Sequence, residues 1–481
     1  MCAFERSEKG MKFFMKKVLI TILMLVIAIS IIPSFANAAN STKIYISDSE
    51  ITVDGKEIGT DTNSSIYLTN KMNNGGTQSE SKSSNIEVEN VININSAGTY
   101  EFTGTLSDGQ ISVNANNING EVKIILNEVN LTCKNAPAIF VYRKNPESED
   151  CKVTIELADG TTNNVVGGKI KQSVQGWEDQ DSILYYVEKD YDDDKQYYER
   201  YKYDGAISSD ISLTFEGTGT LNVTSSKKEG IESKMHITIN DGTYNINSLD
   251  DAINACMDNK SIITINGGTV IANVLDEAEE GDGIDSNGYL YINGGIVYAF
   301  AHHGSDNGLD SDLGTYINGG TVFATGSMYE ECKTSNSTKI VQMNLSKEVE
   351  EGESIIIADE DENVVFAFKT DRKVSTIVYS SNSLEDKTYN IYTGTDIEGT
   401  IEENNIYTTI SSIDLSKMTK QENNTRGGMP GENGRPQMNN QNNNSAMPNT
   451  LAGKITLVVL IVTIISVIAT GTIALCRTKI K

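Results

Sequence analysis

Residues 282–298 read DGIDSNGYLYINGGIVY, and they contain every part of a repeat that extends from about residue 204 to about residue 330. The first part, acid-Gly-aliphatic-acid-Ser, recurs as Glu229–Ser233 and, with one amide, as Asn307–Ser311. The second part places short alternating strands on both sides of an Asn-Gly-Gly-like turn, whose asparagine recurs at positions 240, 266, 293 and 318. A period in the twenties with three short strands per unit is typical of a parallel β-helix. The sequence therefore predicts an all-β solenoid.

The residues of the turns fit this architecture. The Gly-Gly step permits a positive φ at a corner, and asparagine tolerates the same geometry. Because equivalent corners stack, we expect the asparagine amides to hydrogen-bond along the axis of the solenoid, with aliphatic side chains filling its interior. Alternating strands without the repeat follow from 339 to 416 and predict a small C-terminal β cap.

Composition restricts the classes of function. The 481 residues include 66 acids and 39 bases, giving a net charge of -27. Nucleic-acid binding needs a basic patch, so we expect no nucleic-acid partner, and the charge suits cations or substrates bridged by cations. The six cysteines show no CxxC spacing, which argues against a metal-thiolate site. Cys133 and Cys151 allow a disulfide if their strands stack, but we expect buried free thiols.

Both ends of the chain carry apolar segments. Three lysines, an apolar run and Ala36-Asn37-Ala38 form the pattern of a secretory signal peptide. Residues 451–475 are apolar except for Lys454 and long enough to span a bilayer, with basic residues after them. We expect a cell-surface protein that is anchored in the membrane and has an extracellular ectodomain. The alternative is covalent attachment to the cell wall, because Met447–Leu451 resembles a sortase signal with two departures from Leu-Pro-x-Thr-Gly.

The expected organisation follows from these segments. In chain order it comprises a signal peptide (1–38), an N-terminal leader or cap (39–96), a parallel β-helix domain (97–338) with an aromatic insertion (167–203), a C-terminal β cap (339–416), a disordered linker (417–450), a transmembrane helix (451–475) and a cytoplasmic tail (476–481).

The acids of the repeat are the candidate functional groups. Coils stack about 4.8 Å apart, so acids at equivalent positions form columns of like charge that raise each other's pKa. One expected column comprises Asp204, Glu229, Asp251, Asp282 and Asn307, and the other Glu232, Asn254, Asp285 and Asp310. The alternative is that they are solvated turn residues. With no folding role evident, we expect them to bind calcium, which accepts six to eight oxygens in loose geometry. The candidate ligands are Glu229, Glu232, Asp250, Asp251, Asp282, Asp285, Asp306 and Asp310.

Aromatic side chains are candidates for contact with sugars. Tyr289, Tyr291 and Tyr298 alternate with inward residues, and Trp177 lies in the aromatic insertion. The alternative is that these rings pack the insertion onto the side of the solenoid.

Catalysis has weak support, because there are only three histidines and neither a GxSxG nor a HExxH motif. In a calcium-assisted β-elimination, Lys234 or Lys260 would act as the base. The alternative is that both are ordinary surface lysines.

Several runs of sequence resemble a known family. These are GTYEFTGTLSDGQI at 98–111, APAI at 136–139 and the repeated DGIDS and INGGTV units. They resemble the secreted clostridial carbohydrate-binding domain-containing proteins, over roughly 97–326 and on to about 400 with the cap. The resemblance implies a right-handed parallel β-helix related to β-helix polysaccharide lyases, calcium on acidic coil residues, and binding of cellulose or acidic pectin. Carried over by position, the calcium candidates are Glu229, Asp251, Asp282, Asp285 and Asp310, while Ala252, Asn254 and Asn307 depart from the pattern.

The sequence therefore predicts a surface-anchored, calcium-dependent protein that binds polysaccharide. A pectate-lyase-like enzyme and a structural adhesin or stalk are the alternatives.

Overall fold

The computed structural model describes residues 41–72, 87–168, 184–189, 196–201, 205–304, 306–402 and 404–424. In these ranges the regular structure is β apart from two 3-10 helices, η1 (Ala115–Asn117) and η2 (Leu415–Lys417), so the all-β prediction is confirmed. The same ranges contain no helix with the length and apolar character needed to cross a membrane. The expected signal peptide and the expected transmembrane helix lie outside the described residues.

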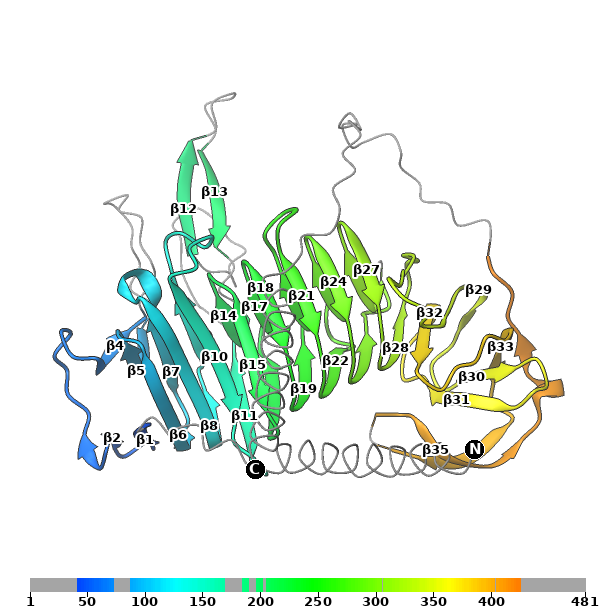
Figure 1. Ribbon diagram of the computed structural model, residues 1–481, viewed down its shortest axis with the longest axis horizontal. Coiled ribbons are helices and arrows are strands. Elements are labelled where there is room, and N and C mark those ends of the chain that lie inside the picture. The colour runs from blue at the N-terminus through cyan, green and yellow to red at the C-terminus, as the bar shows by residue number, and fades with distance from the viewer. Residues whose placement is uncertain are drawn as a thin grey trace, which may run out of the picture. The chain divides into compact units, whose positions relative to one another are not determined.

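Each repeat contributes three strands, which stand beside the equivalent strands of the neighbouring repeats in three rows (Figure 1). The first row is a 9-stranded sheet, and the other two join through the long strand β8 in a 19-stranded sheet. Row one contains β4 (Ile66–Lys71), β5 (Glu87–Ile94), β7 (Gly109–Asn114), β9 (Ile139–Tyr142), β14 (Ile207–Ser209), β17 (Ile231–Ser233), β20 (Ile253–Ala255), β23 (Ile284–Ser286) and β26 (Leu309–Ser311). Row two contains β1 (Thr42–Ile46), β6 (Gly98–Leu106), β8 (Gly120–Thr132), β10 (Cys151–Leu157), β15 (Leu213–Gly217), β18 (His236–Ile239), β21 (Ile262–Ile265), β24 (Tyr289–Ile292) and β27 (Gly314–Ile317). Row three contains β11 (Thr162–Gly167), β16 (Thr220–Ser225), β19 (Thr243–Ser248), β22 (Thr269–Val274), β25 (Ile296–Phe300) and β28 (Thr321–Gly326).

Pairing between consecutive repeats is parallel and keeps equivalent residues side by side. In row one, Ile231 pairs with Ile253, which pairs with Ile284. The copy expected around Asp204 is one residue out of register, because Ile207 pairs with Ile231 and Gly205 therefore takes the position of Glu229. Asp204 itself lies outside the described residues.

The corners behave as the sequence indicates. Asn266 Nδ2 donates to Asn240 Oδ1 (2.9 Å), Asn293 to Asn266 (3.0 Å) and Asn318 to Asn293 (3.0 Å), so the expected amide ladder is confirmed. Gly295 has a φ of +82°, and a Cβ there would lie 2.6 Å from the carbonyl oxygen of Gly268. Only glycine fits a corner that combines this φ with such a close approach.

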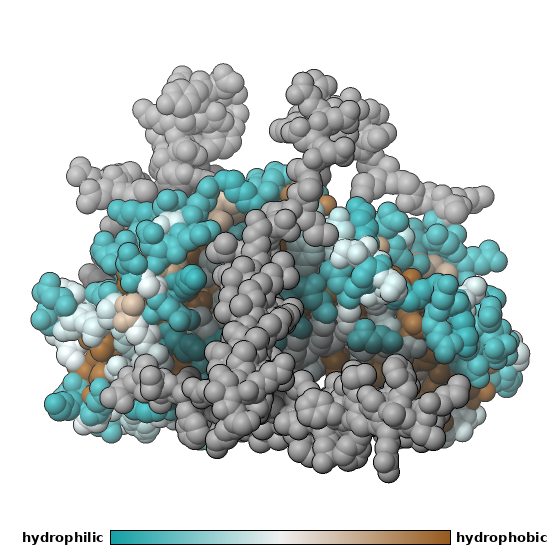
Figure 2. Space-filling view, viewed as in Figure 1, coloured by the Kyte–Doolittle hydropathy of each residue, from teal (hydrophilic) through white to brown (hydrophobic). Residues whose placement is uncertain are grey.

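The inward side chains of all three rows form one hydrophobic core. Along β24, Leu290 and Ile292 are fully buried while the tyrosines beside them are half-buried. Burial of one such aliphatic side chain stabilises the fold by about 1.5–3 kcal/mol. The face seen in Figure 2 is mainly hydrophilic, with hydrophobic residues visible in small patches.

Antiparallel strands border the rows at the N-terminal end. β4 pairs antiparallel with β5, and β2 (Ile51–Val53) with β3 (Lys56–Glu57) extends β1. β1 already pairs in parallel with β6 and β5 with β7, so residues of the expected leader belong to the stack itself. The aromatic insertion contains the antiparallel hairpin β12 (Leu184–Lys189) and β13 (Gln196–Tyr201).

The C-terminal region is an antiparallel β unit packed on the last repeat. Its strands are β29 (Ile340–Val349), β30 (Ser354–Asp359), β31 (Val364–Lys369), β32 (Val374–Ser381), β33 (Tyr389–Gly394), β34 (Ile397–Ile401), β35 (Tyr407–Ile413) and β36 (Thr419–Lys420). β32 pairs antiparallel with β28, and Phe300 and Phe323 of the stack join the core of this unit. The fold continues to Asn424, beyond the expected start of the linker at 417, because Met418 and Gln421 are buried against β33 and its neighbours.

The sequence allowed a disulfide between Cys133 and Cys151 but favoured free thiols. Cys133 and Cys151 are buried free thiols, as expected, and do not form a disulfide.

Candidate functional site

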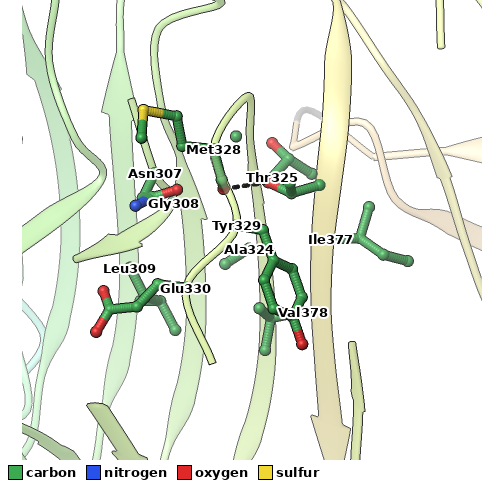
Figure 3. A pocket seen from close by; sticks show the side chains of 12 residues that line it. Asn307, Gly308, Leu309, Ala324, Thr325, Met328, Tyr329, Glu330, Ile377 and Val378 are labelled. Carbon is green, nitrogen blue, oxygen red and sulfur yellow. Dashed lines mark hydrogen bonds between the residues drawn. The ribbon is translucent and has the colours of Figure 1, made fainter. Parts of the chain in front are cut away.

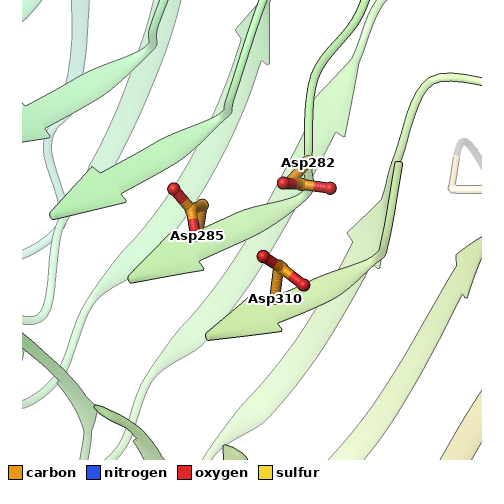
Figure 4. A group of neighbouring side chains, drawn as sticks. All are labelled: Asp282, Asp285 and Asp310. Carbon is orange, nitrogen blue, oxygen red and sulfur yellow. The ribbon is translucent and has the colours of Figure 1, made fainter. Parts of the chain in front are cut away.

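Three carboxylates meet on the outer side of row one. Asp282, Asp285 and Asp310, called the acid cluster below, each offer an oxygen within 4.8 Å of the others, and all three are half-buried (Figure 4). Two oxygens bound to one calcium ion at 2.3–2.6 Å are at most about 5 Å apart. The geometry of the acid cluster therefore fits a hard divalent cation.

The two expected columns exist, and each contains one amide among its described acids. Glu232, Asn254, Asp285 and Asp310 occupy one register position in consecutive strands. Within one repeat the Asn254 amide donates to the Asp251 carboxylate, and two repeats later Asn307 Nδ2 donates to Asp310 Oδ1 (2.9 Å). Each departure from the acidic pattern thus supplies a hydrogen bond to the acid of its own repeat.

The acids also have a folding role, contrary to expectation. The backbone N–H of Asp282 donates to Asp251 Oδ1 at 2.8 Å, and that of Asn307 donates to Asp282. The carboxylates of Asp251 and Asp282 therefore each accept a hydrogen bond from the next repeat and help to fix the stacking.

Asn254 provides an independent observation beside the acid cluster. Its side chain is 3% exposed, and among the described groups its Oδ1 atom has no hydrogen-bond partner. A buried amide oxygen without a partner costs about 1–3 kcal/mol. Because Asn254 is in register with Asp285, its oxygen lies beside the acid cluster. An amide oxygen, like a carboxylate oxygen, is a suitable ligand for calcium.

Burial and mutual repulsion govern the charge of the cluster. Burial, together with the charges of Asp251 and Asp310, raises the pKa of Asp282 to about 9. Like charges in a partly buried site favour protonation of one member. Without a cation, Asp282 is therefore the carboxyl that holds a proton near neutral pH.

Glu330 is a further acid, and it does not belong to the acid-Gly-aliphatic-acid-Ser motif of the repeats. Its carboxylate accepts from the backbone N–H of Ser311 (3.1 Å) and from Ser311 Oγ (3.2 Å). Burial and the neighbouring Asp310 raise its pKa to about 8. Glu330 follows β28, outside the acid-Gly-aliphatic pattern, so only the chain path past the last repeat identifies it.

A small pocket lies next to Glu330 (Figure 3). Its volume is about 10 Å³, which is space for about one water molecule. Asn307, Leu309 and Met328 are among its lining residues, and the Thr376 hydroxyl donates to the carbonyl oxygen of Met328 at 2.9 Å. The pocket is too small for a sugar.

Of the five remaining candidate ligands, Asp251 adjoins the acid cluster through the hydrogen bond from the Asp282 N–H, and the other four have partners outside the cluster. Glu229 and Glu232 are fully buried, and Glu232 accepts from Ser208 Oγ at 2.9 Å. Asp250 forms an ion pair with Lys228 at 2.5 Å. Asp306 lies 3.6 Å from His302 Nδ1, and burial raises the pKa of its carboxyl. Of the eight candidate ligands, the structure brings Asp282, Asp285 and Asp310 together.

A stack of tyrosines occupies the outer side of row two in the same repeats. The rings of Tyr289 and Tyr291 are 5.8 Å apart with an interplanar angle of 29°, and those of Tyr291 and Tyr316 are 5.4 Å apart at 24°. Tyr291 and Tyr316 are paired in register on β24 and β27. These three residues are called the tyrosine stack below. Tyr316 was not among the residues predicted from the sequence to contact sugars.

The other aromatic candidates are not part of this stack. Tyr298 lies on β25 and packs against the core of the C-terminal unit, in register with Phe323. Trp177 lies outside the described residues. The predicted alternation of outward and inward residues thus holds on β25, but another unit covers its outer side.

The candidate bases of a β-elimination are both held in ion pairs. Lys234 Nζ lies 2.6 Å from Asp210 Oδ1, an atom of a buried carboxylate. Lys260 pairs with Glu147. Neither of these partner acids belongs to the acid cluster.

The parallel rows of short strands, to which each repeat adds one strand per row, define the class of repetitive all-β proteins. The family described as "Carbohydrate-binding domain-containing protein" matches residues 88–367. This match covers more than half of the 481 residues, and the chain belongs to that family.

Two known proteins illustrate the relationship. A carbohydrate-binding domain-containing protein of Acetivibrio thermocellus is 30% identical over 159 residues, which is 33% of this chain and 45% of the relative. The chain thus matches less than half of that relative's length. A solved polysaccharide lyase-like protein from C. thermocellum, studied as a gadolinium derivative, is similar over 62% of this chain and 98% of its own, with 18% identity and a TM-score of 0.35.

Proposed function

We propose that this protein is a calcium-dependent carbohydrate-binding protein whose repeats form a right-handed parallel β-helix and whose ligand is a polysaccharide of the cellulose or acidic pectin type. One observation carries the proposal: the acid cluster and the tyrosine stack occupy adjoining strands of the same two repeats, β23 with β24 and β26 with β27. Membership of the carbohydrate-binding domain family supports the class of ligand.

Calcium would be held by the carboxylates of Asp282, Asp285 and Asp310, with the amide oxygen of Asn254 beside them. A bound ion supplies positive charge that attracts the carboxylates of uronic acids. The protein's own residues fix the position: Asn307 orients Asp310 through its amide, and its backbone N–H orients Asp282.

The tyrosine stack would contact the apolar faces of sugar rings. Tyr289, Tyr291 and Tyr316 are half-buried, which keeps the rings in place while leaving part of each ring accessible. Tyrosine provides large contact area at low entropic cost because it has only two χ angles. Its hydroxyl remains suited to hydrogen bonds with sugar hydroxyl groups.

The expected segments at the ends of the chain extend the proposal to location. A signal peptide at 1–38 and a transmembrane helix at 451–475 would present the repeats outside the cell on a linker. Attachment to the cell wall through residues 447–451 is the alternative route to the same surface.

Retention on insoluble polysaccharide tests the proposed function. The full chain would be incubated with pectate coupled covalently to beads and with cellulose, in calcium and in chelator. We expect Asp285→Asn combined with Asp310→Asn to weaken pectate retention about tenfold or more, equal to about 1.4 kcal/mol. We expect Tyr291→Ala to weaken it without altering the response to calcium.

Two control variants match the charge and the ring removed. Asp276→Asn removes an acid whose side chain is 80% exposed, and Tyr45→Ala removes a tyrosine that is 45% exposed on β1. Both should bind normally. If neither polysaccharide retains the wild-type chain with or without calcium, the proposed function is wrong.

A further inference from the structure

A second cavity lies on row three, whereas the acid cluster lies on row one. It has a volume of about 290 Å³ and lies between the outer side of row three and the C-terminal β unit. Its lining includes Asn245, Asn247, Asn273, Phe300, Phe368 and Asp371. The volume approaches that of cavities which enclose small organic ligands.

An amide ladder ends in this groove. Asn164 donates to Asn130 (2.6 Å), Asn222 donates to Asn164 (2.8 Å) and Asn245 donates to Asn222 (2.8 Å), all from Nδ2 to Oδ1. The next residue in register after Asn245 is Ile271, which has no amide. Among the described groups, Asn245 Oδ1 therefore remains as an acceptor at the end of the ladder.

A second pair of amides leaves a donor nitrogen, and not an acceptor oxygen, at the same groove. Asn273 Nδ2 donates to Asn247 Oδ1 at 2.8 Å. The Asn247 amide nitrogen is left as a donor that no described group accepts from. The groove thus presents one fixed acceptor and one fixed donor, both on half-buried side chains of β19.

Arg372 fixes the wall formed by the C-terminal unit. Its guanidinium donates to the carbonyl oxygens of Val274 (2.6 Å) and Ala301 (3.2 Å) and to Asn273 Oδ1 (2.7 Å). It also lies 2.9 Å from Asp371 Oδ1, so the acid in the lining is paired with a base. Among the described residues that line it, the groove consequently carries no uncompensated charge.

The apolar part of the lining combines Ile246 and Ile271 with two aromatic rings. The rings of Phe300 and Phe368 are stacked with centroids 5.2 Å apart and an interplanar angle of 16°. Rigid apolar surface beside a few fixed amide groups is the usual composition of a site for a small polar organic ligand. Sugars without charge match it, because their hydroxyl groups both donate and accept while their C–H faces are apolar.

We propose that this groove is a cation-independent binding site for an uncharged sugar unit of a polysaccharide chain, recognised by Asn245 and Asn247 against the Phe300–Phe368 wall. The inference rests on the proposed carbohydrate-binding function, and it adds a second site with different ligand chemistry. The acid cluster and the groove would then divide acidic and neutral sugars between them.

Calorimetric titration of the full chain tests this division. The probes are cellohexaose, which is neutral, and hexagalacturonate, which is acidic, each in calcium and in chelator. We expect cellohexaose to bind equally in both conditions. We expect Asn245→Ala with Asn247→Ala to weaken its binding at least tenfold, and Asp285→Asn with Asp310→Asn to leave it unchanged.

Two further variants separate the groove from the stability of the ladder. Asn164→Ala breaks the same amide ladder away from the groove, leaves the hydrogen bond between Asn245 and Asn222 in place, and should leave cellohexaose binding unchanged. Ile271→Phe keeps every ladder amide and fills part of the groove, and should weaken binding.

The outcomes distinguish the two proposals. Binding of hexagalacturonate without binding of cellohexaose overturns the groove site and leaves the proposed function intact. Binding of neither probe overturns both. Cellohexaose binding that persists in both groove variants, or that disappears in chelator, also refutes the groove site.

Discussion

Replacing Asp285 by asparagine should change stability in opposite directions with and without calcium. Asp285 has two carboxylate neighbours whose oxygens lie within 4.8 Å of its own. Without a cation, the substitution removes repulsion while keeping the size of the side chain. With calcium bound, it removes one of three charged ligands.

The magnitude follows from these distances. Two unit charges 4.8 Å apart at an effective dielectric constant of about 20 repel by about 3.5 kcal/mol. Because burial and neighbouring charges raise the pKa of Asp282 to about 9, mainly the repulsion between Asp285 and Asp310 acts at neutral pH. Both are half-buried, and solvent screens part of this term. We expect Asp285→Asn to stabilise the calcium-free protein by about 1–3 kcal/mol.

Bound calcium should make the wild-type protein more stable than the Asp285→Asn variant. An ion present at about one hundred times its dissociation constant stabilises the wild-type fold by about 2.7 kcal/mol, and the variant loses most of this gain. Urea denaturation of both proteins in calcium and in chelator measures the four free energies of unfolding. Asp276→Asn makes the same change of charge at an exposed acid and should leave the calcium response intact. If Asp285→Asn destabilises the chelated protein, or responds to calcium as the wild type does, the reasoning about the acid cluster is refuted.

Three further predictions concern other parts of the fold. Arg372→Met should lower the free energy of unfolding by about 3–5 kcal/mol in urea denaturation, because it leaves two buried carbonyl oxygens and Asn273 Oδ1 without their charged donor, at about 1–3 kcal/mol each; a loss below about 1 kcal/mol would contradict this role of Arg372. In chelator, the free energy of unfolding should fall as the pH rises from about 4 to about 8. The pKa values of Asp282 and Glu330 are raised to about 9 and about 8 in the folded protein, which therefore binds more protons than the unfolded chain over this range. Urea denaturation that gives equal stability at both ends of the range would contradict this prediction. Burial raises the pKa of the Cys133 thiol to about 12, so a thiol reagent should label half-exposed Cys256 first and Cys133 only on unfolding; peptide mapping that finds equal rates would disagree.

The sequence was most informative where structure is local and periodic. The asparagine corners and the alternation along β24 follow from side chains that repeat at fixed intervals, and the observed pairing reproduces both. The columns through Asp285 and Asp310 were predicted for the same reason. The copy at Asp204 was misaligned by one residue because it adjoins the insertion, where no repeat fixes the register.

Features that depend on packing between distant segments left no pattern. Glu330 reaches the acid cluster from a segment that continues past the last repeat without its motif. Tyr298 matches the outward pattern, yet the C-terminal unit covers its strand. Arg372 carries no signal in sequence, because its partners are backbone carbonyls far away in the chain. The acids were also expected to lack a folding role, since backbone N–H partners in the next repeat cannot be recognised from residue types.

The corner ladder has a consequence for the chemical lifetime of the protein. Asn266, Asn293 and Asn318 each precede a glycine, and asparagine is among the residues most prone to loss of its amide on heating. Deamidation of Asn293 would replace the donor that faces Asn266 with a carboxylate oxygen, so that two acceptors oppose each other. Mass spectrometry of aged samples would detect this at Asn293 later in folded than in unfolded protein if the ladder shields the amide. Deamidation at Asn293 would therefore break the ladder toward the preceding repeat, while the hydrogen bond that Asn318 donates from the following repeat would be kept.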